Sequence, residues 1–189
     1  MRCTKAMPVH ARCLVLSNGM VGAEKQALAL AEAIGLPFEV RRVKQVIPAL
    51  SRLPSSVLAS ATHLLGSVGV SGIGPIDAPY PALAISCGRG SIPASIALRD
   101  AGRGSTLTVH IQRPECSASW FDLVIVPRHD YPTLAPPNAV LTRGSLHSVT
   151  PELLAAARRE WEPVLRPFPS PRLTLLLGGT GEIATDCPH

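Results

Sequence analysis

Short apolar segments alternate with helical patterns along most of this chain, and no other feature limits its fold as strongly. Each apolar segment is four to six residues long, and several run directly into a loop that contains glycine. A chain that alternates strands and helices covers both faces of its sheet with helices, which requires mostly parallel strands. The predicted strands are 12–17, 38–43, 62–65, 82–86, 106–111, 122–126 and 139–142.

Three segments carry helix signals. Residues 23–34 repeat apolar side chains at helical spacing and end at Gly35, a residue suited to a left-handed cap. Residues 92–101 follow a serine cap, and residues 150–165 open with Thr-Pro-Glu, a cap followed by first-turn residues. The expected fold class is therefore α/β, with a Rossmann-like, mostly parallel sheet and flanking helices.

The composition suits one domain and part of a second. Hydrophobic residues make up 46% of the 189 residues and charged residues 16%, enough apolar surface for a real core. Residues 172–177 read as a buried strand that runs into two glycines, as at the start of a new α/β domain, but no helix pattern follows. The predicted parts are a flexible N-terminus (1–11), a Rossmann-like N-terminal domain (12–148), a connecting helix with a proline-rich linker (149–170), and the first strand of a truncated second domain with a tail (171–189).

Charge and composition exclude several functional classes. The net charge is +5, but the basic residues are scattered and aromatic residues are only 4%, which argues against nucleic-acid binding. No apolar run approaches the length of a membrane-spanning helix, so we expect at most peripheral membrane association. The basic, acid-free start resembles a transit peptide only slightly, and a frayed start before the first strand is favoured.

The cysteines are odd in number and irregularly spaced. The chain has five of them and no Cys-x-x-Cys pair, which argues against a disulfide framework and against a zinc site. We therefore expect a reducing compartment and no bound metal.

Four polar segments follow predicted strands and are the candidate site, because ligands of parallel sheets bind at the carboxyl ends of the strands. In the first segment, Asn18, Gly19 and Gly22 lie between a strand and a helix. Backbone N–H groups of such a loop, together with the helix N-terminus, attract anions. A tight strand-to-helix turn explains these residues equally well.

The second segment adds a cation to the same kind of loop. It contains Cys87, Gly88, Arg89 and Gly90, immediately before the helix at 92–101. A cysteine at a helix N-terminus favours its thiolate form, but a nucleophile also needs an oriented base. No specific partner is evident in the sequence, so we expect Cys87 to be structural or to contact a ligand.

The third and fourth segments are rich in chemistry but ambiguous. His110 and Gln112 alternate onto one side of a strand end, as a polar contact pair or with His110 as a core histidine. Arg128, His129 and Asp130 follow the next strand, where an Asp-anchored turn is an equally good explanation. No catalytic signature is present, so the residues alone predict an α/β domain with an anion-binding rim and no identified catalytic residue.

The chain contains six motifs in a fixed order. They are Leu-Ser-Asn-Gly-Met-Val-Gly-Ala-Glu-Lys-Gln-Ala-Leu-Ala-Leu-Ala (16–31), Ser-Cys-Gly-Arg (86–89), Val-His-Ile-Gln (109–112), Phe-Asp-Leu-Val-Ile-Val-Pro-Arg-His-Asp-Tyr (121–131), Leu-Thr-Arg-Gly-Ser-Leu-His (141–147) and Leu-Leu-Leu-Gly-Gly (175–179). In this order they resemble a plant mitochondrial-fission factor family, named for its elongated-mitochondria phenotype, and its bacterial relatives. The Pro-Arg-His-Asp-Tyr stretch at 127–131 is closer to plant members.

The resemblance implies a fold and two alternative functions. The family is similar to GT-B glycosyltransferases, so the chain would be the N-terminal half of two facing Rossmann-like domains. In plants the family is implicated in recruiting a dynamin-related GTPase to the outer face of mitochondria. The expected function is thus a non-enzymatic adaptor, without cofactor, in the cytosol or on the outer surface of mitochondria.

The alternative is a fragment of a glycosyltransferase-like enzyme whose full-length relative would take a nucleotide sugar. The residues that the resemblance places on the cleft side are Asn18, Gly19, Gly22, Arg89, Gln112, Arg128 and His129.

Overall fold

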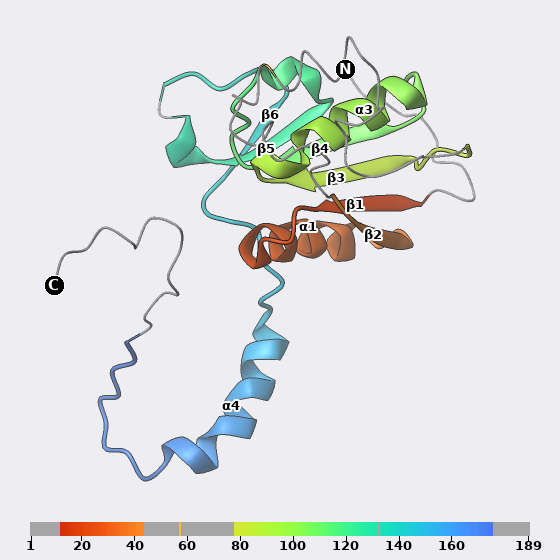
Figure 1. Ribbon diagram of the computed structural model, residues 1–189. Helices are drawn as coiled ribbons and strands as arrows, with labels where there is room; N and C mark the ends of the chain where they lie inside the picture. The colour runs from red at the N-terminus through yellow and green to blue at the C-terminus, as the bar shows by residue number, and fades with distance from the viewer. Residues whose placement is uncertain (1–11, 44–56, 58–77, 132, 176–189) are drawn as a thin grey trace, which may run out of the picture. The chain divides into compact units, whose positions relative to one another are not determined.

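The computed structural model describes residues 12–43, 57, 78–131 and 133–175 (Figure 1). The chain divides into two compact units, Met1–Ser148 and Val149–His189, which are described separately below. The strand predicted at 62–65 and the segments predicted at 1–11 and 176–189 lie outside the described residues.

The first unit is built on a six-stranded sheet in the order β2-β1-β3-β4-β5-β6. Every neighbouring pair is parallel, which confirms the predicted α/β fold with a parallel sheet. Central strands are almost entirely apolar because both of their faces are covered. The strands are β1 (Cys13–Ser17), β2 (Phe38–Arg42), β3 (Leu83–Cys87), β4 (Leu107–Ile111), β5 (Leu123–Pro127) and β6 (Ala139–Thr142).

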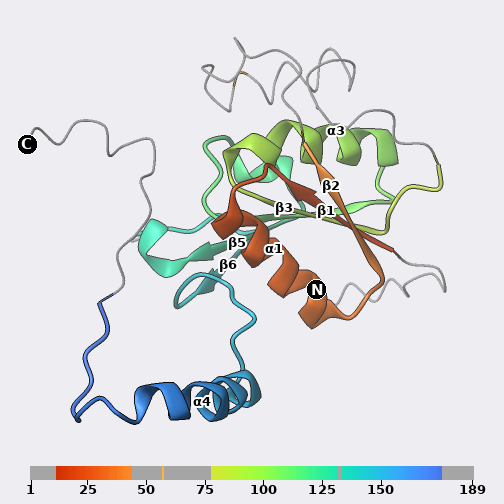
Figure 2. The ribbon, with the colours of Figure 1, turned by 60° about the horizontal axis from the view of Figure 1, so that its bottom comes forward.

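Helices α1 (Val21–Ile34) and α3 (Ile92–Gly102) cover opposite faces of this sheet (Figures 1 and 2). Alternate residues of a strand point to opposite faces, so Val15 packs with the α1 side and Leu14 with the α3 side. Small side chains line the contact face of α1, as Ala27 does, and let this helix approach the strands closely, whereas α3 combines Ala94 with the larger Leu98.

A third apolar cluster lies on the α3 side of the sheet, next to strand β5. Ile92 and Ile96 of α3 pack with Phe121 and with Val124 and Val126 of β5. Among the described residues, three short 3-10 helices lie in the connecting loops, namely η2 (Arg89–Ser91), η3 (Ala118–Trp120) and η4 (Arg128–Asp130). Two of them, η2 and η4, directly follow the carboxyl ends of strands.

The second unit contains helix α4 (Pro151–Leu165), which begins as its sequence predicts. The Oγ1 of Thr150 accepts a hydrogen bond from the backbone N–H of Leu153 at 3.2 Å. The strand predicted over 172–177 is absent at 172–175, where Leu173 is 97% exposed. This part of the prediction is wrong because an apolar segment becomes a strand only when a neighbouring strand takes its backbone hydrogen bonds, and no described strand pairs with it.

Candidate functional site

All four predicted site segments meet at one edge of the sheet. They follow β1, β3, β4 and β5, and parallel strands end at the same edge. The structure nevertheless divides the predicted residues into two groups, those on the surface of this edge and those buried beneath it.

The loop after β1 satisfies its own backbone. The N–H of Gly19 donates to Ser17 Oγ at 3.1 Å, and the N–H of Met20 donates to Asn18 Oδ1 at 3.0 Å. The Ser17 hydroxyl also hydrogen-bonds the carboxylate of Glu24. Gly22 lies in the first turn of α1, which begins at Val21, two residues before the predicted start. These N–H groups are therefore engaged within the loop.

The loops after β1 and β3 touch each other at two glycines. Gly88 has a φ of +77°, and a Cβ there would lie 3.3 Å from Asn18 Nδ2 and 3.7 Å from Gln112 Oε1. A Cβ on Gly90 would lie 3.1 Å from the Cβ of Asn18. Three segments that the sequence presents separately thus converge here, and glycine is needed at Gly88 for both its backbone conformation and its close neighbours.

Arg89 is paired rather than isolated. Its Nε lies 3.3 Å from Glu115 Oε2, in the loop after β4, and both side chains are about half exposed. Glu115 was not among the predicted site residues. No signal in the sequence joins it to Arg89, because the two come from different loops.

Cys87 lies in the core beneath the edge. It is 2% exposed, in the cluster between α1 and the sheet, and burial raises the pKa of its thiol to about 12. The thiol is therefore protonated at neutral pH. The thiolate that its place before a helix favours does not form, because desolvation outweighs any effect of the helix N-terminus. Of the two roles left open, the structure supports the structural one.

His110 is also a core residue. It is 1% exposed, its Nδ1 lies 2.9 Å from Ser86 Oγ, and its ring stacks on Phe121 with centroids 4.7 Å apart. Burial lowers its pKa to about 3, so it is neutral at physiological pH. Gln112 lies just past the end of β4 and has a φ of +80°. Because His110 is buried, the structure supports the core-histidine interpretation over the contact pair.

The loop after β5 presents its charges at the surface. Arg128 and His129 are exposed, and His129 Nε2 lies 3.5 Å from Asp130 Oδ1. Arg113 ties this turn to the loop after β4, because its Nη1 donates to the Asp130 carbonyl at 3.2 Å and its guanidinium lies 5.1 Å from the ring centre of Tyr131. The sequence reasoning missed Arg113, although it stands two residues past the end of a strand.

Comparison with known proteins decides the family. The family model described as mitochondrial fission ELM1 matches residues 21–184, which is most of the chain. This chain belongs to the mitochondrial fission ELM1 family. The resemblance seen in the six sequence motifs is thereby confirmed.

A curated relative gives the extent of the similarity. The mitochondrial fission protein ELM1 of Arabidopsis thaliana is 26% identical over 234 aligned residues, covering 88% of this chain and 55% of the relative. The ELM1-family chain thus spans about half the length of the curated relative that it matches. No solved structure matches the chain significantly.

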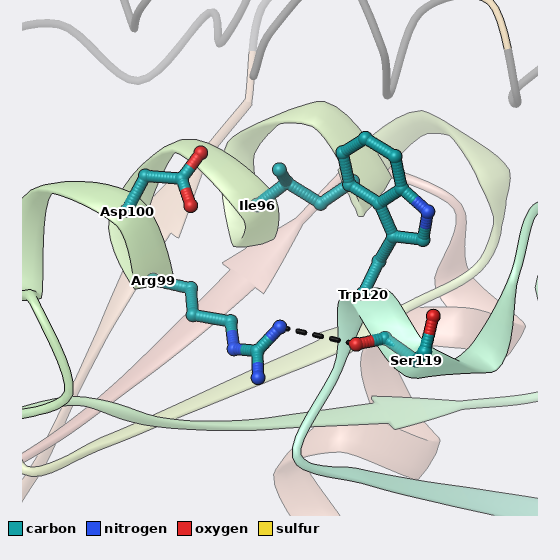
Figure 3. A pocket seen from close by; sticks show the side chains of 5 residues that line it. All are labelled: Ile96, Arg99, Asp100, Ser119 and Trp120. Carbon is teal, nitrogen blue, oxygen red and sulfur yellow. Dashed lines mark hydrogen bonds between the residues drawn. The ribbon is translucent and has the colours of Figure 1, made fainter.

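Away from the strand ends, this ELM1-family chain has an open pocket of about 190 Å³ on the α3 side (Figure 3). It lies toward the amino end of β5, distant along the sheet from the predicted edge, and Arg99 already donates to the Ser119 carbonyl at its wall. Its lining residues are Ile96, Arg99, Asp100, Ser119 and Trp120.

Two negative findings apply to the part of the chain that the structure describes. No cluster of three or more histidine, cysteine or carboxylate side chains there is placed to hold a metal ion. None of the helices there is both long enough and apolar enough to cross a membrane.

Proposed function

We propose that this ELM1-family chain acts as a non-enzymatic mitochondrial-fission adaptor, which helps recruit a dynamin-related GTPase to the outer surface of mitochondria. The observation that carries this proposal is the family match over residues 21–184, which takes in nearly the whole sheet and the helix after it. The relative in that family is named as a mitochondrial fission protein.

The chemistry of the sheet edge supports binding rather than covalent catalysis. Cys87 and His110, the predicted edge residues best suited to act as nucleophile or base, are both buried and uncharged at neutral pH. The charged groups that reach the surface are arginines and the His129–Asp130 pair. Such groups recognise a partner through charge and hydrogen bonds.

Depletion and co-purification in the native cells test this function. Removal of the protein should lengthen the mitochondria, and re-expression should restore their length. The variant Cys87→Ala should restore it equally, because the thiol serves only the core. A tagged chain should also co-purify with a dynamin-related GTPase. Unchanged mitochondrial length together with no co-purified GTPase would exclude the adaptor role.

A nucleotide-sugar-binding enzyme of the glycosyltransferase type is the second candidate. It is favoured by the convergence of the loops after β1, β3 and β4 at the carboxyl ends of the strands, because parallel α/β sheets bind nucleotides at this position. Titration calorimetry with UDP-glucose and other nucleotide sugars would measure nucleotide-sugar binding directly. Absence of heat, for this chain and for any longer form, removes this candidate.

A further inference from the structure

Arginine recurs at the carboxyl ends of the strands. Within the described residues, β2, β3, β4, β5 and β6 each have an arginine as the last residue or within two residues after it, and only β1 lacks one. These residues are Arg42, Arg89, Arg113, Arg128 and Arg143, which we call the arginine edge.

The sheet topology gathers these arginines although they are far apart in the sequence. The strands β3, β4, β5 and β6 are consecutive neighbours in the sheet, so their four arginines are spread over about 15 Å at the usual strand spacing. Side-chain contacts join the loops directly, from Arg89 to Glu115 and from Arg113 to Asp130 and Tyr131. The arginine edge is therefore one continuous surface from β3 to β5.

Positive charge is in excess on this surface. The carboxylates in the described loops of the edge are Glu115 and Asp130, with Glu24 in the first turn of α1 bonded to Ser17. Arg128 and Arg143 are exposed, and neither guanidinium group forms a hydrogen bond or ion pair with the described residues. Two guanidinium groups are thus available to a partner.

Apolar side chains are exposed after β1, the strand next to β3, which Arg89 follows. Met20 and Val21, at the end of the loop after β1, are 66% and 68% exposed. Methionine and arginine are both enriched at protein interfaces, where an apolar anchor is combined with directional polar contacts. The edge therefore has the composition of a protein-docking surface.

We propose that the arginine edge docks an acidic, extended segment of a protein partner, a proposal that rests on the adaptor function above. Guanidinium groups bind carboxylates through charge-assisted hydrogen bonds, and Arg89 already forms an ion pair with the carboxylate of Glu115. A spread of about 15 Å matches four or five residues of an extended peptide carrying several carboxylates, at about 3.3 Å per residue. A single small anion would engage only one or two of these arginines.

Fluorescence anisotropy with a fluorescein-labelled deca-glutamate peptide tests the proposal on the purified chain. The edge variant is R128E/R143E, which alters two exposed residues whose guanidinium groups form no hydrogen bond or ion pair with the described residues. The matched control is R158E/R159E, which changes the net charge equally on helix α4. Circular dichroism and thermal unfolding check that both variants keep the native fold.

We expect the wild-type chain to bind the peptide, the edge variant to lose at least tenfold in affinity, and the control to stay within twofold. Binding should weaken as salt rises from low to physiological concentration. Absence of binding, or an equal loss in both variants, overturns the proposal. The second experiment is flotation with cardiolipin-containing vesicles. If the chain binds these vesicles through the arginine edge but does not bind the peptide, the edge is a membrane-binding surface and the peptide-docking proposal is overturned.

The proposal and the fission function fail separately. Peptide binding uses purified components, whereas the fission function is measured as mitochondrial length in cells. If the peptide binds through the arginine edge but depletion leaves mitochondrial length unchanged, the docking surface is supported and the adaptor function is excluded. If depletion changes mitochondrial length but the peptide does not bind through the edge, the adaptor function is supported and this docking surface is excluded.

Discussion

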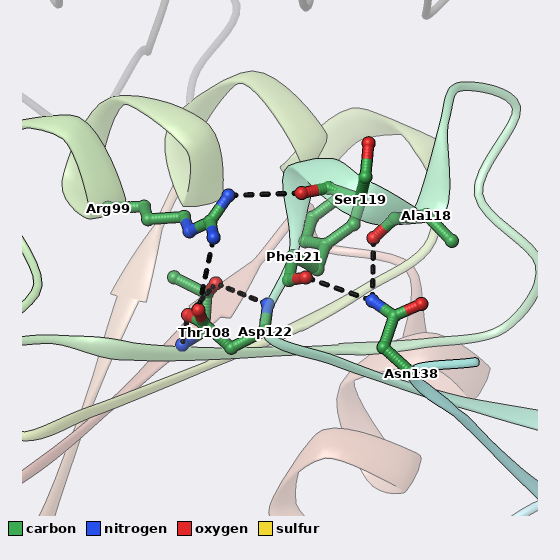
Figure 4. A network of polar contacts seen from close by, with 7 residues as sticks. All are labelled: Arg99, Thr108, Ala118, Ser119, Phe121, Asp122 and Asn138. Carbon is green, nitrogen blue, oxygen red and sulfur yellow. Dashed lines mark hydrogen bonds and ion pairs between the residues drawn. The ribbon is translucent and has the colours of Figure 1, made fainter. Parts of the chain in front are cut away.

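Asp122 Oδ1 accepts a hydrogen bond from Arg99 Nη2 at 3.1 Å, joining helix α3 to the start of strand β5 (Figure 4). The second oxygen, Oδ2, accepts from both the backbone N–H and the hydroxyl of Thr108 on β4, each at 2.8 Å. One carboxylate therefore connects a helix and two strands. Asn138 connects the same region to the chain before β6, since its Nδ2 donates to the carbonyls of Ala118 and Phe121 at 2.8 and 2.9 Å.

Asp122→Ala should lower the free energy of unfolding by about 2 kcal/mol, because Arg99 and the N–H of Thr108 both lose a charged acceptor. Urea unfolding followed by circular dichroism measures the loss. Glu32→Gln, on the exposed side of α1, is the control and should change stability by less than about 0.5 kcal/mol. Equal effects of the two substitutions would show that the Asp122 contacts contribute little.

The buried His110 should make stability depend on pH. Its pKa is lowered to about 3 in the folded chain, whereas an unfolded histidine titrates near 6.5, so below about pH 6.5 only the unfolded state binds the proton. Between pH 7 and pH 5 the free energy of unfolding should fall by about 2 kcal/mol from this group alone.

His110→Asn removes the titrating ring, so the comparison isolates this contribution. The variant should lose about 2 kcal/mol less than the wild-type chain over the same pH range, measured by urea unfolding at each pH. Parallel stability curves for the two proteins would mean that His110 is protonated in the folded state, contrary to its burial.

Two neighbouring threonines should respond oppositely to substitution by valine. The buried hydroxyl of Thr106 has no hydrogen-bond partner among the described residues, so Thr106→Val should leave stability unchanged or raise it by up to about 1 kcal/mol. Thr108→Val removes a hydroxyl that bonds Asp122 and should cost about 1–2 kcal/mol. Thermal unfolding of both variants measures the contrast, which an equal loss in the two would contradict.

Gly90→Ala should destabilise the fold by about 1 kcal/mol, because the new Cβ would lie 3.1 Å from the Cβ of Asn18. Asn18→Gly in the same chain should restore part of the loss, which a double-mutant cycle in urea detects. Gly22→Ala is the matched control, since its Cβ meets open space at the start of α1. Additive effects of Gly90→Ala and Asn18→Gly on the free energy of unfolding would show that the two loops are not in steric contact.

Most regular elements of the first unit were predicted from local patterns. The predicted strand at 106–111 corresponds to β4 (Leu107–Ile111), and the strand predicted at 122–126 corresponds to β5 (Leu123–Pro127). These predictions succeed because each short apolar run pairs with a neighbouring strand on both of its sides. The segment at 172–175 has the same pattern but forms no strand, because pairing with another strand is not a local property.

The candidate site was predicted only in its location. Parallel strands end at one edge, so residues such as Arg128 and Asn18 were placed there correctly from the order of elements alone. The contacts were not predictable, because Arg99 and Asp122 are 23 residues apart and Arg89 meets Glu115 from a different loop. Nothing in a sequence pattern pairs side chains over such separations.

The amino-acid sequence by itself determined that this chain forms a parallel α/β sheet with polar loops at the ends of its strands, because periodicity, glycine and helix caps act over a few residues. Only the tertiary structure decided which of those polar residues face the solvent. Cys87 and His110 became core residues, whereas Arg128 and Arg143 remained exposed. The physical reason is that the burial of a side chain depends on which distant segments pack onto its strand. Helix α1 packs over Cys87, and Phe121 packs against His110.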